Sequence, residues 1–213
     1  MKGVLSVIEL MNVCKSLSSK SVLKNITYNF EYGKVYGLYG INGSGKTMLM
    51  RAIAGLITID SGEIIIDGKV LHKEISFPDN IGIVIENMEL LPKYNAYDKL
   101  KLLSEIRKKA TDDDIILSLK RVGLETNIKV KKYSLGMKQR LNIAQAVFER
   151  QKIILLDEPT NALDDKGVKL IYDIIKEERD RGAFVLISTH HREDLEETCD
   201  IILNVSEGQI SED

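Results

Sequence analysis

A glycine-rich segment early in the chain has the residue types and the spacing needed to hold an anion. Residues 40–47 read GINGSGKT, so a lysine and a threonine directly follow the last of three glycines. The segment comes after an apolar run at 35–39 that predicts a strand and before a stretch at 48–56 that predicts a helix. Glycines let the backbone curl around a ligand, and the helix aims its free N–H groups and positive dipole end at it. The pattern predicts a phosphate-binding loop.

The side chains of this loop indicate a nucleoside triphosphate as the ligand. Lys46 can bridge the outer phosphates as a point charge, and the Thr47 hydroxyl can coordinate Mg²⁺. We therefore expect Lys46 to act in catalysis as well as in binding. The expected nucleotide-binding residues of the loop are Gly40, Asn42, Gly43, Ser44, Gly45, Lys46, Thr47 and Met48.

A pair of acidic residues marks a second candidate site. The apolar run at 153–156 predicts a buried strand, and Asp157 and Glu158 follow it directly. Carboxylates at the end of a buried strand are costly to desolvate unless they have partners, which a metal ion and a water would supply. Asp157 suits Mg²⁺, held directly or through water, and Glu158 would then polarise the attacking water. A nucleoside triphosphate and Mg²⁺ are the expected ligands.

The elements around these motifs predict an α/β fold. Nearly continuous apolar runs begin at 35, 81, 153 and 184, as is typical of parallel strands covered on both faces. Asp67-Gly68 and Glu207-Gly208 are hairpin-turn signals, so antiparallel pieces should flank the parallel core.

The middle of the chain, 95–149, has helical patterns but no convincing strand and is expected to form a helical insert. Thr111 followed three residues later by Asp114 predicts a capping box at the start of one of its helices. The residues expected to share the apolar face of that helix are Ile115, Ile116, Leu119 and Val122.

Composition and charge narrow the function classes further. The 213 residues suit one α/β domain, and 30 Lys and Arg against 32 Asp and Glu leave no basic excess for binding nucleic acid. Cys14 and Cys199 lack the spacing of a metal site. The N-terminal segment is too polar and too short for a signal peptide, and no apolar run reaches the length that spans a bilayer. We expect a cytoplasmic protein whose membrane span, if its process needs one, belongs to another chain.

The stretch after Lys131 resembles one particular family. KKYSLGMKQRLNIAQA at 131–146 is similar to the LSGGQ-x-Q-R signature of ATP-binding cassette (ABC) proteins, and it lies shortly before the aspartate strand, as in that family. Residues 161–164 resemble the family's D-loop, and His190 at the end of a strand resembles its switch histidine. Ser134 is also a good helix N-cap, so it opens a second helix N-terminus suited to anions.

This resemblance implies both a fold and a role. It implies a P-loop NTPase core with a mainly parallel sheet, an antiparallel β subdomain and an inserted α-helical subdomain. The chain would be one domain, with the core and β subdomain at 1–86 and 151–213 and the helical subdomain at 87–150. The role implied is the ATPase subunit of an ABC transporter, bound through integral membrane transporter subunits to the inner face of the cell membrane. The SLGM form of the signature is associated with bacterial transporters for antibiotics, peptides or polysaccharides.

The resemblance also implies a head-to-tail dimer, most simply of two identical chains. Ser134 and Gly136 of one chain would contact the γ-phosphate held by the loop of the other. Glu158, His190 and Lys46 would be the catalytic residues, with His190 preferred over its neighbour His191.

Two positions outside the signature depart from the family pattern. Glu86 stands where a glutamine usually touches Mg²⁺ or its water; glutamate keeps an oxygen ligand but adds negative charge, and we expect it still to sense the metal. Leu17 stands where an aromatic residue usually stacks on adenine, and we expect apolar contact to replace stacking. Within the signature, Leu135 and Met137 replace glycine and glutamine.

Some alternatives stay open at this stage. A soluble ABC-type ATPase that is not attached to a transporter, or a small P-loop kinase, would also use the phosphate loop. One apolar stretch after Glu86 could line a groove for a membrane-subunit helix or form the core of the helical insert. It contains Met88, Leu90, Leu91, Tyr94 and Tyr97.

Overall fold

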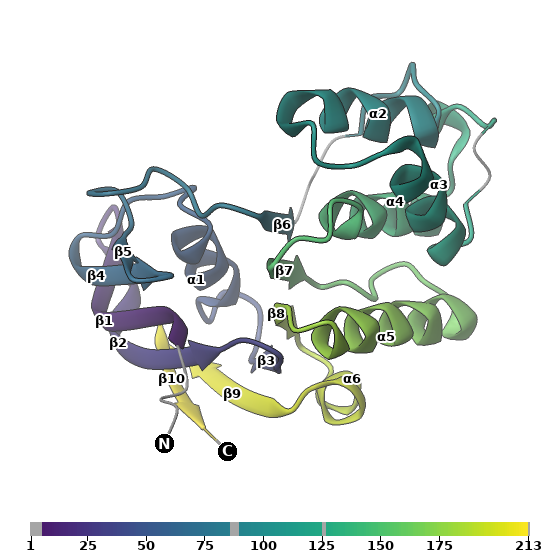
Figure 1. The fold of residues 1–213 in the computed structure, drawn as a ribbon. Helices are drawn as coiled ribbons and strands as arrows, with labels where there is room; N and C mark the ends of the chain where they lie inside the picture. Colours follow the sequence, from purple (N-terminus) through teal and green to yellow (C-terminus); the bar gives the residue numbers. More distant parts are fainter. Residues whose placement is uncertain (1–5, 86–89, 125–126, 213) are drawn as a thin grey trace.

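A central sheet of six strands carries the elements that end at the predicted motifs (Figure 1). The computed structural model describes residues 6–85, 90–124 and 127–212. The strand order is β10-β9-β3-β8-β7-β6, with parallel pairing throughout except for the antiparallel pair of β9 and β10. The strands are β3 (Val35–Tyr39), β6 (Ile81–Val84), β7 (Ile153–Asp157), β8 (Phe184–Thr189), β9 (Ile201–Ser206) and β10 (Gln209–Glu212).

The parallel strands are buried on both faces, as their continuous apolar runs predicted. In β7, Ile153 and Leu155 belong to one hydrophobic core, whereas Ile154 and Leu156 belong to another on the opposite face. Because successive side chains of a strand point to opposite faces, both faces must be apolar. The result is a sheet between two layers, and its polar groups lie at the strand ends.

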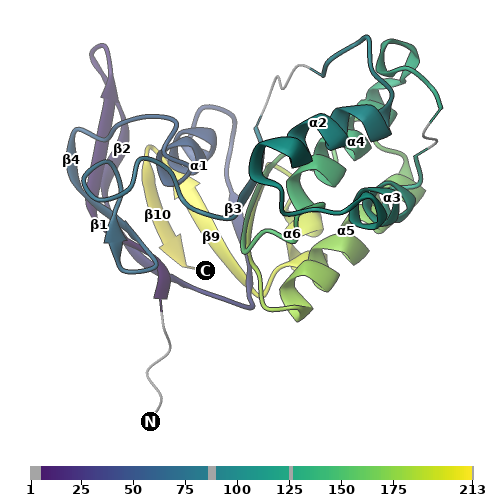
Figure 2. The same ribbon diagram turned by 45° about the horizontal axis from the view of Figure 1, so that its top comes forward.

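A second sheet of four antiparallel strands packs over one face of the first, in the order β2-β1-β4-β5 (Figure 2). Its strands are β1 (Ser6–Leu17), β2 (Lys20–Glu31), β4 (Ser61–Ile66) and β5 (Lys69–Val70). Both predicted hairpin turns are confirmed, since Asp67-Gly68 joins β4 to β5 and Glu207-Gly208 joins β9 to β10. All four turn residues have positive φ, as a two-residue turn that follows the strand twist requires.

The described part of 95–149 is helical, as predicted, and its helices lie together beside β6 and β7 (Figure 1). None of the helices in the described residues combines the length and apolar character needed to cross a bilayer. The α-helices of the described residues are α1 (Lys46–Ile53), α2 (Ala96–Arg107), α3 (Asp112–Arg121), α4 (Leu135–Val147), α5 (Asp165–Asp180) and α6 (Arg192–Thr198), and a short 3₁₀ helix, η1 (Val130–Lys132), precedes α4.

The capping box of α3 is confirmed, but its apolar face differs from the prediction by one residue. The Thr111 hydroxyl accepts from the Asp114 N–H, and the Asp114 carboxylate accepts from the Thr111 N–H. Ile115 and Leu119 are buried, whereas Ile116 is 51% exposed. Positions four apart share a helix face but adjacent positions are rotated by about 100°. The assignment of Ile116 to the buried face was therefore wrong.

One close contact fixes α4 against the sheet. A Cβ atom at Gly82 of β6 would lie 1.8 Å from the carbonyl oxygen of Ala146. A side chain of any kind at position 82 would therefore push α4 away. The helix that begins at the signature segment is held at backbone distance from the sheet.

Candidate active site

The predicted motifs converge because three neighbouring parallel strands end at the same edge of the sheet. β8 pairs with β3 on one side and with β7 on the other. Parallel strands present their carboxyl ends together. The phosphate loop follows β3, the acidic pair ends β7, and His190 follows β8. Residues far apart in the sequence thus form one site.

The three glycines of the phosphate loop serve two different purposes. Gly43 and Gly45 have φ of 80° and 119°, in the region that favours glycine. Gly40 instead allows close packing, because a Cβ atom there would lie 2.3 Å from the carbonyl oxygen of Val205. Lys46 closes the loop: its Nζ donates to the carbonyl oxygens of Gly40 at 2.6 Å and Ile41 at 3.1 Å.

The loop has two features expected of an anion site. Helix α1 begins after Gly45, where no side chain caps its N–H groups in the described structure. The buried Ser44 Oγ also has no hydrogen-bond partner among the described residues. A buried hydroxyl without a protein partner is unusual, and its position in the loop suits a ligand contact.

A cavity of about 410 Å³ joins the loop to the acidic pair. Its volume is in the range of small-molecule sites. Residues of the predicted loop and both predicted carboxylates line it. The lining residues are Lys20, Val22, Asn42, Gly43, Gly45, Lys46, Thr47, Met48, Asp157 and Glu158.

Val22 and Met48 are the apolar residues that line this cavity, and the predicted adenine contact Leu17 is not among its described lining residues. Val22 also lines an adjoining hollow of about 670 Å³, which extends over Lys24 and Glu207. The described linings of both hollows omit Leu17, which is 47% exposed at the end of β1. β1 and β2 pair up to Leu17 and Lys20, and this register carries Val22 to the loop. No local pattern in the sequence indicated that Val22 would line the cavity.

Asp157 and Thr47, two of the predicted metal ligands, are hydrogen bonded to each other at the cavity. The Thr47 hydroxyl donates to Asp157 Oδ2 at 2.7 Å, and the Ser188 hydroxyl donates to Oδ1. These bonds satisfy a carboxylate that is only 4% exposed. Glu86, the third predicted metal ligand, lies outside the described residues.

Glu158 and His190 form a hydrogen-bonded pair. His190 Nδ1 lies 2.8 Å from Glu158 Oε1. The other carboxylate oxygen, Oε2, is buried and has no partner among the described residues. His190 therefore holds Oε1 in place, whereas Oε2 can accept a hydrogen bond from another group. The spacing of these residues in the sequence did not indicate that they would touch.

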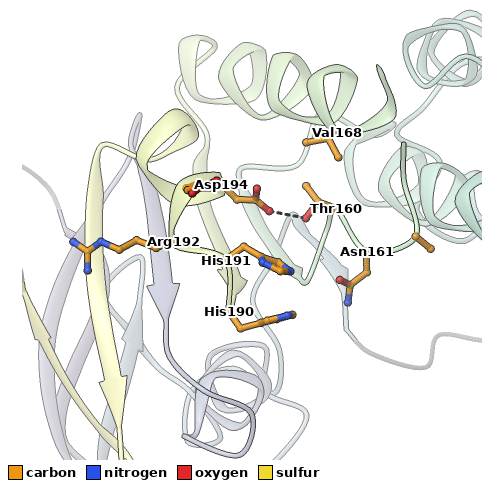
Figure 3. A pocket seen from close by; sticks show the side chains of 9 residues that line it. Thr160, Asn161, Val168, His190, His191, Arg192 and Asp194 are labelled. Carbon is orange, nitrogen blue, oxygen red and sulfur yellow. Dashed lines mark hydrogen bonds between the residues drawn. The ribbon is translucent and has the colours of Figure 1, made fainter. Parts of the chain in front are cut away.

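The ring of His190 also lies 4.0 Å, centroid to centroid, from the ring of His191, at a second cavity of about 560 Å³ (Figure 3). Asn161 and Asp194 line the same cavity. The Thr160 hydroxyl donates to Asp194 at 3.0 Å. Burial, and then a hydrogen bond to Asp194, raises the pKa of the Tyr172 phenol.

The signature serine caps α4, as predicted. Ser134 Oγ accepts from the Met137 N–H at 3.2 Å. Ser134 is exposed, and the following Leu135 is 69% exposed. Neither Ser134 nor Gly136 is among the residues that line the 410 Å³ cavity. Within one chain, this helix N-terminus is thus left open to a further partner.

The comparisons with known proteins agree with this geometry. Residues 23–161 match the family model described as ABC transporter. The chain is 55% identical over 205 residues to the uncharacterized ABC transporter ATP-binding protein YybJ of Bacillus subtilis (strain 168), covering 95% of this chain and 94% of YybJ. It is 37% identical over 207 residues to the lantibiotic transport ATP-binding protein SrtF of Streptococcus pyogenes, covering 95% and 88%.

The solved structures lead to the same class. The dimeric, post-hydrolysis ATP-binding cassette MJ0796 bound to ADP and Pi matches with a TM-score of 0.86 and 26% identity over 97% of each chain. The chain therefore belongs to the ABC transporter family. It is an ATP-binding, ATP-hydrolysing subunit of that family, and the fold and family predicted from the motifs are confirmed.

Proposed function

We propose that two copies of this chain close over two molecules of Mg·ATP and so drive separate membrane subunits. The observation that carries this proposal is the shared cavity: Lys46 and Thr47 of the phosphate loop and the carboxylates Asp157 and Glu158 line one space. A triphosphate and its attacking water would thus lie between a cation and a base.

Lys46, Glu158 and His190 have different roles in the proposed hydrolysis of ATP. Lys46, held by two carbonyl oxygens, supplies fixed positive charge toward the phosphates. Glu158 Oε2 accepts the proton of the attacking water, while the bond between Oε1 and His190 keeps the carboxylate in place. The asymmetry of the two oxygens supports Glu158 as the base and His190 as the residue that orients it.

The residues present fit a magnesium ion that arrives with the nucleotide. Within the described residues no group of three or more acidic, histidine or cysteine side chains could hold a metal ion alone. Thr47 Oγ1 and Asp157 Oδ2 are oxygen atoms 2.7 Å apart, and Mg²⁺ prefers one or two protein ligands together with phosphate oxygens and waters. Bound there, the ion would neutralise phosphate charge. Glu86 is proposed to sense it.

Ser134 and Gly136 are proposed to seal the nucleotide held by a second copy. A Ser134→Asp substitution tests this proposal, because aspartate caps helices as well as serine does but places negative charge opposite the γ-phosphate. We expect the ATP-dependent dimer, formed in a Glu158→Gln background and measured by light scattering, to weaken at least about tenfold with the melting temperature unchanged.

The matched control is Ser76→Asp, which adds the same charge at an exposed loop position. It should leave the dimer intact. A Ser134→Asp protein that dimerises as well as the control would contradict the two-chain site.

The chain is proposed to act as one domain, with its described helices at 96–147 serving as the contact to membrane subunits at the cytoplasmic face. Leu90 and Tyr97 pack partly buried against the core, whereas Leu91 is 49% and Tyr94 39% exposed. The apolar stretch is therefore divided between residues that pack in the core and residues that are exposed; Met88 lies outside the described residues. The exposed pair offers a docking surface for a partner helix.

A Tyr94→Asp substitution is expected to detach the protein from native cell membranes. An exposed aromatic anchor commonly carries much of an interface's binding energy, so the fraction that sediments with membranes should fall about tenfold. Ile106→Asp is the control: this residue is 77% exposed at the far end of α2, about 15 Å along the helix from Ala96. Equal loss from both variants would refute docking at 91–94.

A further inference from the structure

The backbone of Glu158 has an unfavourable conformation that depends on hydrogen bonds to neighbouring segments of the chain. Its φ is 48°, in the left-handed region that residues other than glycine rarely adopt. On one side, its N–H donates to the carbonyl oxygen of Ser188 at 2.9 Å. On the other, its carbonyl oxygen accepts from the N–H of Asn161 at 3.2 Å. The direction of the Glu158 side chain depends on these bonds.

A side chain from α4 completes the support. The Gln139 amide Nε2 donates to the carbonyl oxygens of Glu158 at 3.2 Å and Pro159 at 3.1 Å. Both partners can only accept, so the NH₂ end of the amide must face them. Gln139 thus bonds to the two peptide units on either side of Pro159, the first of which directly follows Glu158.

A second contact joins the same helix to the same loop. A Cβ atom at Gly136, in the first turn of α4, would lie 2.8 Å from the carbonyl oxygen of Ala162. The start of α4 therefore packs on the loop 158–162 at backbone distance and is hydrogen bonded to it through Gln139. A shift of this helix end cannot leave the loop in place.

We propose that Gln139 is a positioning residue that couples Ser134 to Glu158 within one chain. When Ser134 meets the nucleotide of the partner copy, α4 is fixed, and Gln139 fixes the main chain that aims the base at the chain's own nucleotide. Each site would then become active only when the other is filled. This inference rests on the proposed two-chain arrangement.

The expected effect of losing the Gln139 amide is on turnover and not on binding. Gln139→Met keeps the side-chain length but donates nothing, and Gln139→Glu keeps the shape but places carboxylate oxygens against two carbonyls. Lys46 and Thr47 are untouched, so ATP affinity and KM should stay within about twofold. A misplaced base should lower kcat about tenfold in both variants.

Gln145→Met is the matched control. Gln145 lies on the same helix but accepts from Lys99 Nζ of α2 at 2.5 Å, so this variant removes an α4 amide without touching the loop. It should lower the melting temperature and leave kcat per folded protein within about twofold. The experiment measures kcat, KM, ATP affinity and melting temperature for all three variants.

The readouts separate this inference from the proposed function. A tenfold loss of kcat at constant KM and affinity, absent from Gln145→Met, supports positioning. Wild-type kcat in Gln139→Met, an equal kcat loss in Gln145→Met, or a fall in ATP affinity as large as that in kcat would overturn it. If Glu158→Gln itself forms no dimer with ATP, the proposed two-chain function fails. If that dimer forms but Gln139→Met prevents it, Gln139 acts in assembly and the positioning role is refuted.

Discussion

The Glu158→Gln protein is expected to lose ATP turnover by about a thousandfold while it still binds ATP, since general-base groups contribute about 10² to 10⁴ in rate. Glu158 is 7% exposed, one of its oxygens bonds to His190, and the other is buried and free among the described residues. An amide has nearly the same shape but is far too weak a base to take a proton from water. The nucleotide-bound dimer should therefore accumulate.

The measurement is steady-state phosphate release together with light scattering in the presence of ATP. Glu105→Gln makes the same chemical change at an exposed position of α2 and should turn over ATP at the wild-type rate. If Glu158→Gln released phosphate at a rate within about tenfold of wild type, Glu158 would not be the general base.

Most of the fold could be predicted because its core strands carry continuous apolar runs. The ends of the strands β1 and β2 could not be predicted in this way. β1 runs from Ser6 to Leu17, through a polar segment with register shifts between Leu10 and Lys15. That segment is held by pairing with β2 and β4, and pairing between distant strands leaves little trace in local composition.

The candidate site was predictable to the extent that its groups belong to contiguous motifs. The phosphate loop and the acidic pair lie within short segments, and the sheet brings them together. The bond between Glu158 and His190, the lining role of Val22 and the bonds of Gln139 are tertiary contacts. These contacts depend on the order of the strands and on the position of a helix. The spacing of residues along the chain therefore could not predict them.

The Lys46→Met protein is expected to bind ATP at least about a hundredfold more weakly than wild type, because removing one partner of a buried charge pair costs about 3–5 kcal/mol. The lysine is 5% exposed, and two carbonyl oxygens hold its ammonium inside the phosphate loop. Methionine keeps an unbranched stem similar to that of lysine but lacks the terminal ammonium. Titration calorimetry with ATP measures the effect directly.

Lys20 provides the control, since it lines the same cavity but is exposed. An exposed ion pair is worth about 0.2–1 kcal/mol, so Lys20→Met should weaken ATP binding less than about fivefold. The two variants delete the same charge, and burial accounts for the difference expected between them. Equal losses of ATP affinity in the two variants would mean that long-range attraction, and not a fixed contact inside the loop, binds the phosphates. Strong ATP binding by Lys46→Met would contradict the phosphate site itself.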